Sequence, residues 1–283
     1  MFLAAGTEGF YGKLSEEQLV RLIRQAGFDG IDYSSFLSDR CRVLFGTDYR
    51  DQAQLTRQQL EEHSLCCYQA HAPFRRFTFG DAFSMDDPHF QELVRSIEYA
   101  AVLGAEHIVI HGIAVPNASG GEATFEYNLR FFRALEPYAK AHGIRIALEN
   151  QRYTFNVPYM LNEMLSRLAS DTFVACVDVG HAMLSMGSPE AYISCVTPGM
   201  VRGLHIHDNN GVTDEHLLPG LGVLRWDAIL QALAKTGYSG TFTLETCFFD
   251  TTFDAAVMPE LLALEAAVGR QLIRDLERIR SAT

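Results

Sequence analysis

Six residues of metal-ligand type stand at the ends of short apolar runs that lie far apart in the sequence. They are His71, His111, Glu149, Asp178, His205 and Glu245. Carboxylate and imidazole groups together suit divalent cations such as Mn²⁺, Co²⁺, Zn²⁺, Fe²⁺ or Mg²⁺. If these side chains meet in the fold, they repel one another or stay unsatisfied unless a cation joins them. The pattern therefore indicates a divalent metal centre, with Glu149, Asp178, His205 and Glu245 as its core.

Each of these residues taken alone has a plainer interpretation. A single histidine near a strand end is more often a hydrogen-bonded structural group than a ligand. A single glutamate on a strand is commonly an exposed residue. The common register of all six favours the metal site, and it does so most strongly for the four core residues.

Two segments that follow the core residues carry further ligand types. His181 comes three residues after Asp178, beyond a glycine that we expect to be flexible. The segment after His205 is rich in turn formers and holds His207, Asp208, Asp214 and His216. A solvated turn with an Asx cap is the alternative interpretation of this segment. We favour the site, because Asp214 and His216 are two residues apart and would share one side of an extended chain.

The elements that must position these residues alternate along the chain. Short apolar runs occupy residues 2–6, 28–34, 65–71, 107–112, 144–150, 173–180, 201–208 and 240–246. Helix-like stretches occupy residues 15–27, 51–63, 88–104, 124–143, 158–170, 225–237 and 258–280. Several of these stretches end at a glycine suited to a left-handed C-cap, namely Gly27, Gly104, Gly143 and Gly237.

Eight strands that alternate with helices predict a single-domain (β/α)₈ TIM barrel over residues 1–283. A doubly wound open sheet is the alternative, and the lack of a G-x-G-x-x-G turn after the first run weakens it. Within the runs, apolar residues such as Ile146 and Leu148 alternate with a mixed face that ends in Glu149. The apolar face would pack on helices, and the last residues of the mixed face would project together into the barrel mouth.

The bulk composition restricts the class of protein. Of the 283 residues, 48% are hydrophobic, which allows a sizeable core. The chain has 23 basic and 35 acidic residues and a net charge of −12. That balance disfavours a protein that wraps DNA or RNA, because neutralising phosphates requires a basic face.

The sequence also restricts location and partners. No stretch approaches the roughly 20 apolar residues of a membrane span, and the N-terminal segment lacks the basic start of a signal peptide. The six cysteines form no C-x-x-C pair, so a thiolate zinc site has no support. We expect a cytoplasmic protein with reduced thiols and no membrane partner. A homo-oligomer stays open, because the helix expected at 258–280 suits either pairing or core packing.

Several phrases in the chain resemble the xylose isomerase-like TIM-barrel superfamily, which includes sugar isomerases and epimerases, inosose dehydratases and type-IV apurinic endonucleases. The phrases are HAPF (71–74), GAEHIVIHG (104–112), IALEN (146–150), CVDVGHA (176–182), HIHDNNGVTDEHLLPGLG (205–222) and GTFTLET (240–246). Each phrase alone is weak, but their order and spacing together are fairly specific.

The resemblance to the sugar-processing members implies one divalent metal (Mn²⁺, Co²⁺, Zn²⁺ or Mg²⁺) held by Glu149, Asp178, His205 and Glu245. It also implies a small carbohydrate substrate and an enediolate mechanism, in which the two glutamates act as the catalytic pair. Return of the proton to the opposite face makes an epimerase, and return to the neighbouring carbon makes an isomerase. His181 matches a position that contacts a substrate oxygen.

The endonuclease branch implies a different activity on the same barrel. Its three zinc ions have nine ligands, and matching residue types stand here at His71, His111, Glu149, Asp178, His181, His205, Asp214, His216 and Glu245. The acidic composition weighs against this function, as does Glu215, which stands where the nuclease has an arginine. Sugar-processing relatives also keep several of these phrases. An inosose dehydratase-type lyase shares the enolisation step and stays open as well.

The chain departs from the ketose 3-epimerases in two places. Those enzymes have a second glutamate shortly after the fifth strand and an arginine after the metal histidine, and neither is present here. Arg152 follows the fifth strand instead, and its guanidinium suits a carboxylate or a phosphate of a substrate. A solvated loop arginine is an equally good interpretation. Substrate or further metal contacts are therefore expected from His71, His111, His181, Asp214, His216 and Arg152.

Overall fold

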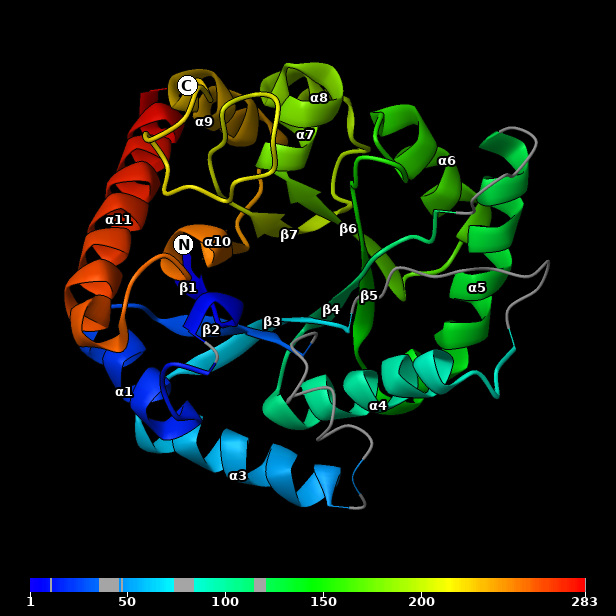
Figure 1. Cartoon of the computed structure of the whole chain (residues 1–283). Coiled ribbons are helices and arrows are strands. Elements are labelled where there is room, and N and C mark those ends of the chain that lie inside the picture. Colours follow the sequence, from blue (N-terminus) through cyan, green and yellow to red (C-terminus); the bar gives the residue numbers. More distant parts are fainter. Residues whose placement is uncertain (11, 36–45, 47, 74–83, 115–120, 283) are drawn as a thin grey trace.

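The computed structural model describes residues 1–10, 12–35, 46, 48–73, 84–114 and 121–282, and its strands form a parallel barrel (Figure 1). The strands are β1 (Phe2–Gly6), β2 (Gly30–Ser34), β3 (Cys66–His71), β4 (His107–Ile110), β5 (Arg145–Glu149), β6 (Phe173–Asp178), β7 (Val201–His205) and β8 (Thr241–Leu244). Their order is β7-β6-β5-β4-β3-β2-β1-β8. A parallel bridge between Ile206 and Leu244 joins the two ends of this sheet. The predicted (β/α)₈ fold is confirmed.

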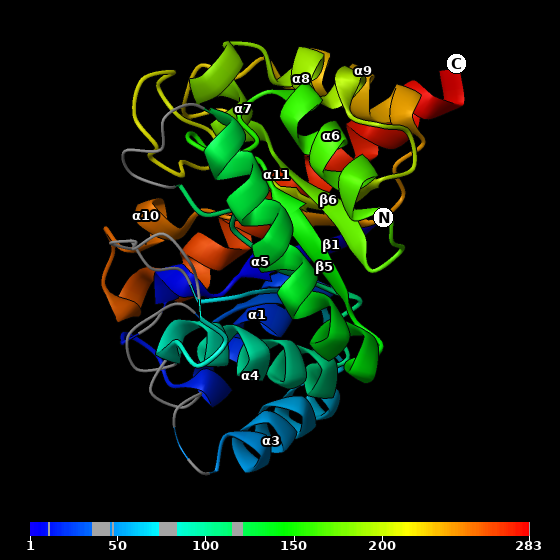
Figure 2. The same ribbon diagram turned by 90° about the vertical axis from the view of Figure 1, so that its right-hand side faces the viewer.

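Helices surround the strands on the outside of the ring (Figures 1 and 2). The long ones are α1 (Glu16–Ala26), α3 (Tyr49–Glu62), α4 (Pro88–Leu103), α5 (Gly121–His142), α6 (Pro158–Leu168), α9 (Trp226–Thr236) and α11 (Met258–Ala282). All seven predicted helices are present. The four predicted glycine caps have left-handed φ values between 65° and 98°.

Several short elements were not expected from the sequence. They are α7 (Val179–Met186), α8 (Pro189–Cys195), α10 (Cys247–Asp250) and the 3₁₀ turns η1 (Glu8–Phe10) and η2 (Ala255–Val257). The apolar run at 173–180 was predicted as one strand, but β6 ends at Asp178 and α7 begins at once. The Asp178 carboxylate caps α7 by accepting a hydrogen bond from the His181 N–H at 2.6 Å. The strand pattern could not show this switch, because Val179 suits both elements.

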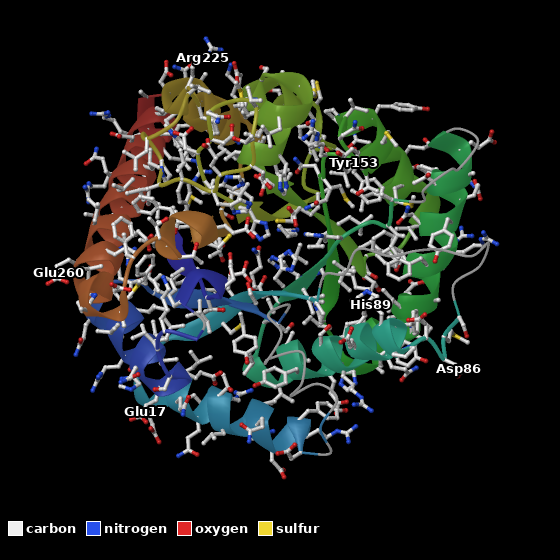
Figure 3. The ribbon with its side chains drawn as sticks, viewed as in Figure 1. Glu17, Asp86, His89, Tyr153, Arg225 and Glu260 are labelled. Atoms are coloured by element: carbon white, nitrogen blue, oxygen red, sulfur yellow. The ribbon has the colours of Figure 1, made fainter. Side chains whose placement is uncertain are left out.

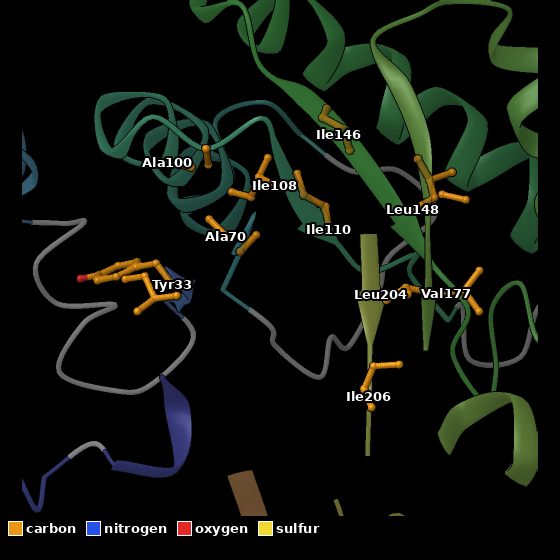
Figure 4. Close-up of a cluster of buried hydrophobic side chains, with 14 of the residues drawn as sticks. Tyr33, Ala70, Ala100, Ile108, Ile110, Ile146, Leu148, Val177, Leu204 and Ile206 are labelled. Carbon is orange, nitrogen blue, oxygen red and sulfur yellow. The ribbon is translucent and has the colours of Figure 1, made fainter. Parts of the chain in front are cut away.

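The predicted alternation of the strands separates two layers of the core. Ile108, Ile110, Ile146 and Leu148 point outward and belong to the main cluster that packs against the helices (Figure 4). Inside the barrel lies a small separate cluster of Val109, Ala147, Val174 and Cys176. The remaining inner positions include polar residues, so apolar packing fills the barrel interior only in part.

The mouth of the barrel lies at the carboxyl ends of the strands. In Figure 2 the segment after β7 (yellow) and α10 (orange) lie on the left side, whereas both termini lie on the right. Among the described residues, no helix is both long enough and apolar enough to span a membrane.

A side-chain clamp ties the last helix to the amino end of the barrel. The Arg270 guanidinium of α11 donates to both oxygens of Asp29 at 2.7 and 2.8 Å and to the Gly27 carbonyl at 2.6 Å. Asp29 Oδ2 also accepts the Leu3 N–H at 2.8 Å. The clamp therefore connects α11, the end of α1 and the first strand.

Replacing Arg270 tests this clamp. We expect Arg270→Ala to lower the free energy of unfolding by about 1–2 kcal/mol, because a bidentate ion pair and a backbone contact are lost. Arg270→Lys keeps the charge but not the planar fork, and we expect roughly half of that loss. Urea unfolding measures both, with the exposed Arg274→Ala as the control. Equal midpoints for all three variants and the wild type would show that the clamp contributes nothing.

Candidate metal centre

The six predicted strand-end residues converge at the mouth of the barrel. His71, Glu149, Asp178 and His205 are the last residues of β3, β5, β6 and β7, and His111 and Glu245 directly follow β4 and β8. In Figure 3, side-chain nitrogen and oxygen atoms gather inside the ring of strands. The ligand atoms form overlapping groups, within each of which they lie no more than 4.8 Å apart.

The central group contains the four predicted core ligands. His205 Nδ1 lies 3.4 Å from Glu245 Oε2, 3.6 Å from Glu149 Oε1 and 3.8 Å from Asp178 Oδ2. Ligands about 2.1 Å from a tetrahedral zinc ion are about 3.4 Å from one another. Two of these atoms, His205 Nδ1 and Glu245 Oε2, are buried without a hydrogen-bond partner among the described residues. The four side chains therefore fit a divalent cation in both spacing and chemistry.

A second group shares Glu149 with the first. Glu149 Oε2 lies 2.9 Å from His111 Nε2 and 3.4 Å from His71 Nε2, and the two imidazole nitrogens are 3.0 Å apart. Gln151 Nε2 donates to Glu149 Oε1 at 2.8 Å. Glu149 thus lies between the two groups with one oxygen directed to each.

A third group is built from the segments that follow β6 and β7. Asp214 lies 3.2 Å from His181 Nε2 and 3.3 Å from His216 Nε2, with one carboxylate oxygen directed to each ring. The predicted meeting of Asp214 and His216 is confirmed, but the extended backbone expected for them is wrong. His216 has a left-handed φ of 47°, so the backbone is not extended at this residue.

His207 also belongs to this third group, although the sequence interpretation left it in the loop without a role. Its Nε2 lies 3.0 and 3.1 Å from the two oxygens of Asp178, and its ring stacks on His216 at 3.9 Å and 4°. The spacing His205-x-His207 was the available signal, because alternate residues of an extended segment share a side.

The close approach of His207 explains a glycine that was expected to be flexible. Gly180 is helical, within α7, and a Cβ atom there would lie 2.0 Å from Cε1 of the His207 ring. Its function in the fold is to leave room for that ring. The predicted flexibility of Gly180 is therefore wrong.

The segment that holds Asp214 and His216 is organised by Asp208. The buried Asp208 carboxylate accepts backbone N–H groups of Asn209 at 2.9 Å, Gly220 at 2.9 Å and Leu224 at 3.1 Å. It also accepts the Trp226 indole N–H at 3.0 Å. One carboxylate therefore holds both ends of the turn-rich segment.

Glu8, in the turn η1 that follows the first strand, also lies near the site, and the sequence interpretation missed it. Glu8 is 5% exposed, and its Oε2 accepts the Ser34 hydroxyl at 2.5 Å. A Cβ atom at Gly6 would lie 3.1 and 3.2 Å from its two oxygens, so the glycine makes room for the carboxylate. Glu8 Oε1 has no hydrogen-bond partner in the described part of the chain. No ligand pattern marks this residue, because β1 itself ends in small side chains.

Arg152 does not join these groups. It is exposed, and its guanidinium lies 5.7 Å from the ring centre of Tyr153, which is itself 72% exposed (Figure 3). Within the described ranges it makes no hydrogen bond or ion pair with the nine ligands. Phe74 of the HAPF phrase lies outside the residues that the structure describes.

The pKa values of the two central glutamates are displaced in opposite directions. Burial raises the pKa of Glu245 well above its usual range, and the carboxylate of Glu8 adds to this. Burial also opposes ionisation of Glu149, but the imidazoles of His111 and His205 outweigh it and hold its pKa well below the usual range. Two carboxyl groups separated in this way suit opposite roles in proton transfer.

Comparison with known proteins places this chain in a family. Residues 20–267 match the family described as xylose isomerase-like TIM barrel. This chain belongs to the xylose isomerase-like TIM-barrel family. An uncharacterised protein of Sinorhizobium fredii, y4fM, is 28% identical over 256 residues, which cover 80% of this chain and 79% of that protein.

Solved structures superpose on nearly the whole of this chain. A D-tagatose 3-epimerase-like protein superposes with a TM-score of 0.73 at 20% identity, covering 96% of this chain and 100% of that one. The IolI protein with a bound zinc atom superposes with a TM-score of 0.73 at 18% identity, covering 95% and 97%. At these identities the likeness establishes the fold of the xylose isomerase-like family in this chain, and the site residues must be argued from their own geometry.

Replacing Asp208 tests the organisation of the third ligand group. We expect Asp208→Ala to lower the free energy of unfolding by about 2–3 kcal/mol, because it leaves several hydrogen-bond donors without their acceptor. The segment 209–224 should also become sensitive to limited proteolysis. The exposed Asp171→Ala is the control and should match the wild type in both assays. A protease-resistant Asp208→Ala protein of wild-type stability would contradict this role.

Proposed function

We propose that this chain is a divalent-metal-dependent isomerase or epimerase that acts on a sugar, a sugar phosphate or a cyclitol. The observation that carries the proposal is the central group, in which two buried atoms of ligand type, His205 Nδ1 and Glu245 Oε2, lie 3.4 Å apart and have no hydrogen-bond partner among the described residues. A cation bound there would lie between two glutamates, in the arrangement that the proposed proton transfer needs. The D-tagatose 3-epimerase-like neighbour supports a carbohydrate substrate, and the zinc of IolI supports a metal.

Glu149, Asp178, His205 and Glu245 would hold the cation. When bound, a divalent ion polarises a substrate carbonyl and makes the adjacent C–H more acidic. One glutamate then takes the proton from that carbon while the C–H electron pair moves into an enediolate. The other glutamate returns a proton, either to the opposite face or to the neighbouring carbon, so the reaction involves no net oxidation.

The contacts of the two glutamates favour a different role for each in the proposed reaction. Glu149 is committed on both oxygens, because Gln151 donates to Oε1 and His111 contacts Oε2. Glu245 Oε2 has no such partner among the residues described. Glu245 is therefore the more available proton carrier, and Glu149 is the better anchored ligand.

A zinc-dependent apurinic endonuclease is the second candidate, and the three ligand groups favour it. All nine positions expected for three zinc ions meet at the mouth. Two features weigh against it. The net charge is −12, which is unfavourable for binding a DNA backbone. Glu215, where the nuclease has an arginine, accepts the Asn210 N–H at 2.9 Å and so serves the loop itself. A dehydratase-type lyase would use the same enolisation at the central group.

Replacing Glu245 tests the proton-transfer proposal. We expect Glu245→Gln to lower the rate by at least about 100-fold, because the amide cannot carry the proton. The measurement is incorporation of solvent deuterium next to the carbonyl, across a panel of ketohexoses, their phosphates and keto-inositols. Glu17→Gln makes the same chemical change on the exposed side of α1 and should leave the rate unchanged. Full activity in folded Glu245→Gln protein, or in protein stripped of metal, would refute the proposal.

Metal stoichiometry separates the two candidate functions. We expect one tightly bound divalent ion per chain, because the central group contains two facing atoms of ligand type that have no hydrogen-bond partner among the described residues. Elemental analysis after dialysis counts the ions, and a nicking assay on duplex DNA with an abasic site measures the alternative activity. Three zinc ions together with nicking would establish the endonuclease in place of the sugar enzyme.

A further inference from the structure

A row of buried polar side chains lies inside the barrel next to His205. Asp32, Gln69 and His107 are 2%, 0% and 3% exposed, and His205 itself is 0% exposed. The interior of a (β/α)₈ barrel is usually filled by branched apolar side chains. Polar groups buried in their place are costly unless every hydrogen bond is made. Packing alone therefore does not explain why these polar side chains are buried inside the barrel.

The donor and the acceptor can be assigned consistently for each hydrogen bond among these four side chains. His107 Nε2 lies 2.8 Å from Gln69 Oε1, and Gln69 Nε2 donates to Asp32 Oδ2 at 2.5 Å. His205 Nε2 lies 3.2 Å from that same oxygen. The Gln69 amide can satisfy both neighbours only if its oxygen accepts from the His107 N–H and its nitrogen donates to Asp32. Asp32 then accepts from both Gln69 and His205.

Burial and space in the barrel interior favour this arrangement. Burial lowers the pKa of His107 to about 4, so its ring is neutral and carries a single N–H. Gly203 faces the bond between the two side chains, since a Cβ atom there would lie 2.5 Å from Gln69 Oε1 and 3.0 Å from His107 Nε2. The absence of a side chain on β7 at this position is what admits the row.

The consequence concerns the other nitrogen of the His205 ring. When a cation displaces the proton on Nδ1, the remaining proton of the ring stays on Nε2, where Asp32 holds it, and Nδ1 faces Glu149, Asp178 and Glu245. A metal ion binds only an unprotonated ring nitrogen, and the partner of the second nitrogen decides which one is free. The Nδ1 atom is buried without a hydrogen-bond partner within the described residues.

We infer that Asp32, supported by Gln69 and His107, is a positioning residue that sets the tautomer and orientation of His205 for a divalent cation. This inference rests on the proposed metal site, and it assigns the buried polar interior of the barrel to that site. Asp32 belongs to none of the candidate ligand groups and would act through His205.

Metal affinity measures this role without any assay of turnover. We expect Asp32→Asn to raise the dissociation constant for Zn²⁺ by about 10–100-fold, as removal of a carboxylate behind a ligand histidine does. Competition with a chromophoric chelator measures the constant on the metal-free full chain. The absorption bands of bound Co²⁺ should also change, because the donor strength of His205 is altered.

Asp29→Asn is the matched control, because it makes the same change in a bonded carboxylate at the opposite end of the barrel. We expect it to lower stability through the lost Arg270 pair while leaving the Zn²⁺ constant at the wild-type value. Gln69→Leu removes one donor to Asp32 without touching either Asp32 or His205. We expect a smaller loss of Zn²⁺ affinity, on the order of 3–10-fold, and this variant also serves if Asp32→Asn does not fold.

The outcomes separate this inference from the proposed function. Wild-type protein that takes up no Zn²⁺ or Co²⁺ would overturn both. Wild-type protein that binds metal, with folded Asp32→Asn and Gln69→Leu variants of unchanged affinity, would overturn the inference alone. An equal loss of affinity in Asp29→Asn would also overturn it, since the effect would then follow stability and not the contact with His205.

Discussion

The structure depends on a concentration of buried carboxylates and imidazoles at the carboxyl ends of the barrel strands. Glu149, Asp178 and His205 are each no more than 1% exposed, and Glu245 is 6% exposed. Charges taken out of water are costly unless other charges or hydrogen bonds compensate them. The side chains compensate one another in part, and the facing unpartnered atoms on His205 and Glu245 show where compensation by a cation would act.

The barrel holds these carboxylates and imidazoles in fixed positions. Four of the candidate ligands are the last residues of strands, where the hydrogen bonds of the sheet hold each one against its neighbour. The remaining candidate ligands are positioned by local contacts. The Asp178 carboxylate starts α7 and so places His181, while Asp208 gathers the turn-rich segment that carries Asp214 and His216. Gly180 and Gly203 act by leaving room for a histidine ring and for a buried hydrogen bond.

A fold does not by itself fix a reaction, so function must be decided within the site. Here Glu149 is hydrogen-bonded through both oxygens, whereas Glu245 Oε2 has no hydrogen-bond partner among the described residues. That asymmetry suits proton transfer beside a carbonyl. The polar row beneath His205 extends the site into the barrel interior. If the proposed cation site is correct, part of what looks like core serves that site, at a cost in apolar packing.

The sequence alone was sufficient for the architecture and for most of the centre. Strand and helix periods predicted the barrel, and the ligand types at run ends predicted Glu149, Asp178, His205 and Glu245, because strand order in a parallel barrel brings those ends together. It could not show the start of α7 after Asp178, the left-handed turn at His216, or the contacts of Glu8, Asp32 and His207. These depend on the approach of side chains from distant strands, and a local pattern carries no record of such distances. Only the tertiary structure brings Asp32 within 3.2 Å of His205 Nε2, because Asp32 lies on another strand.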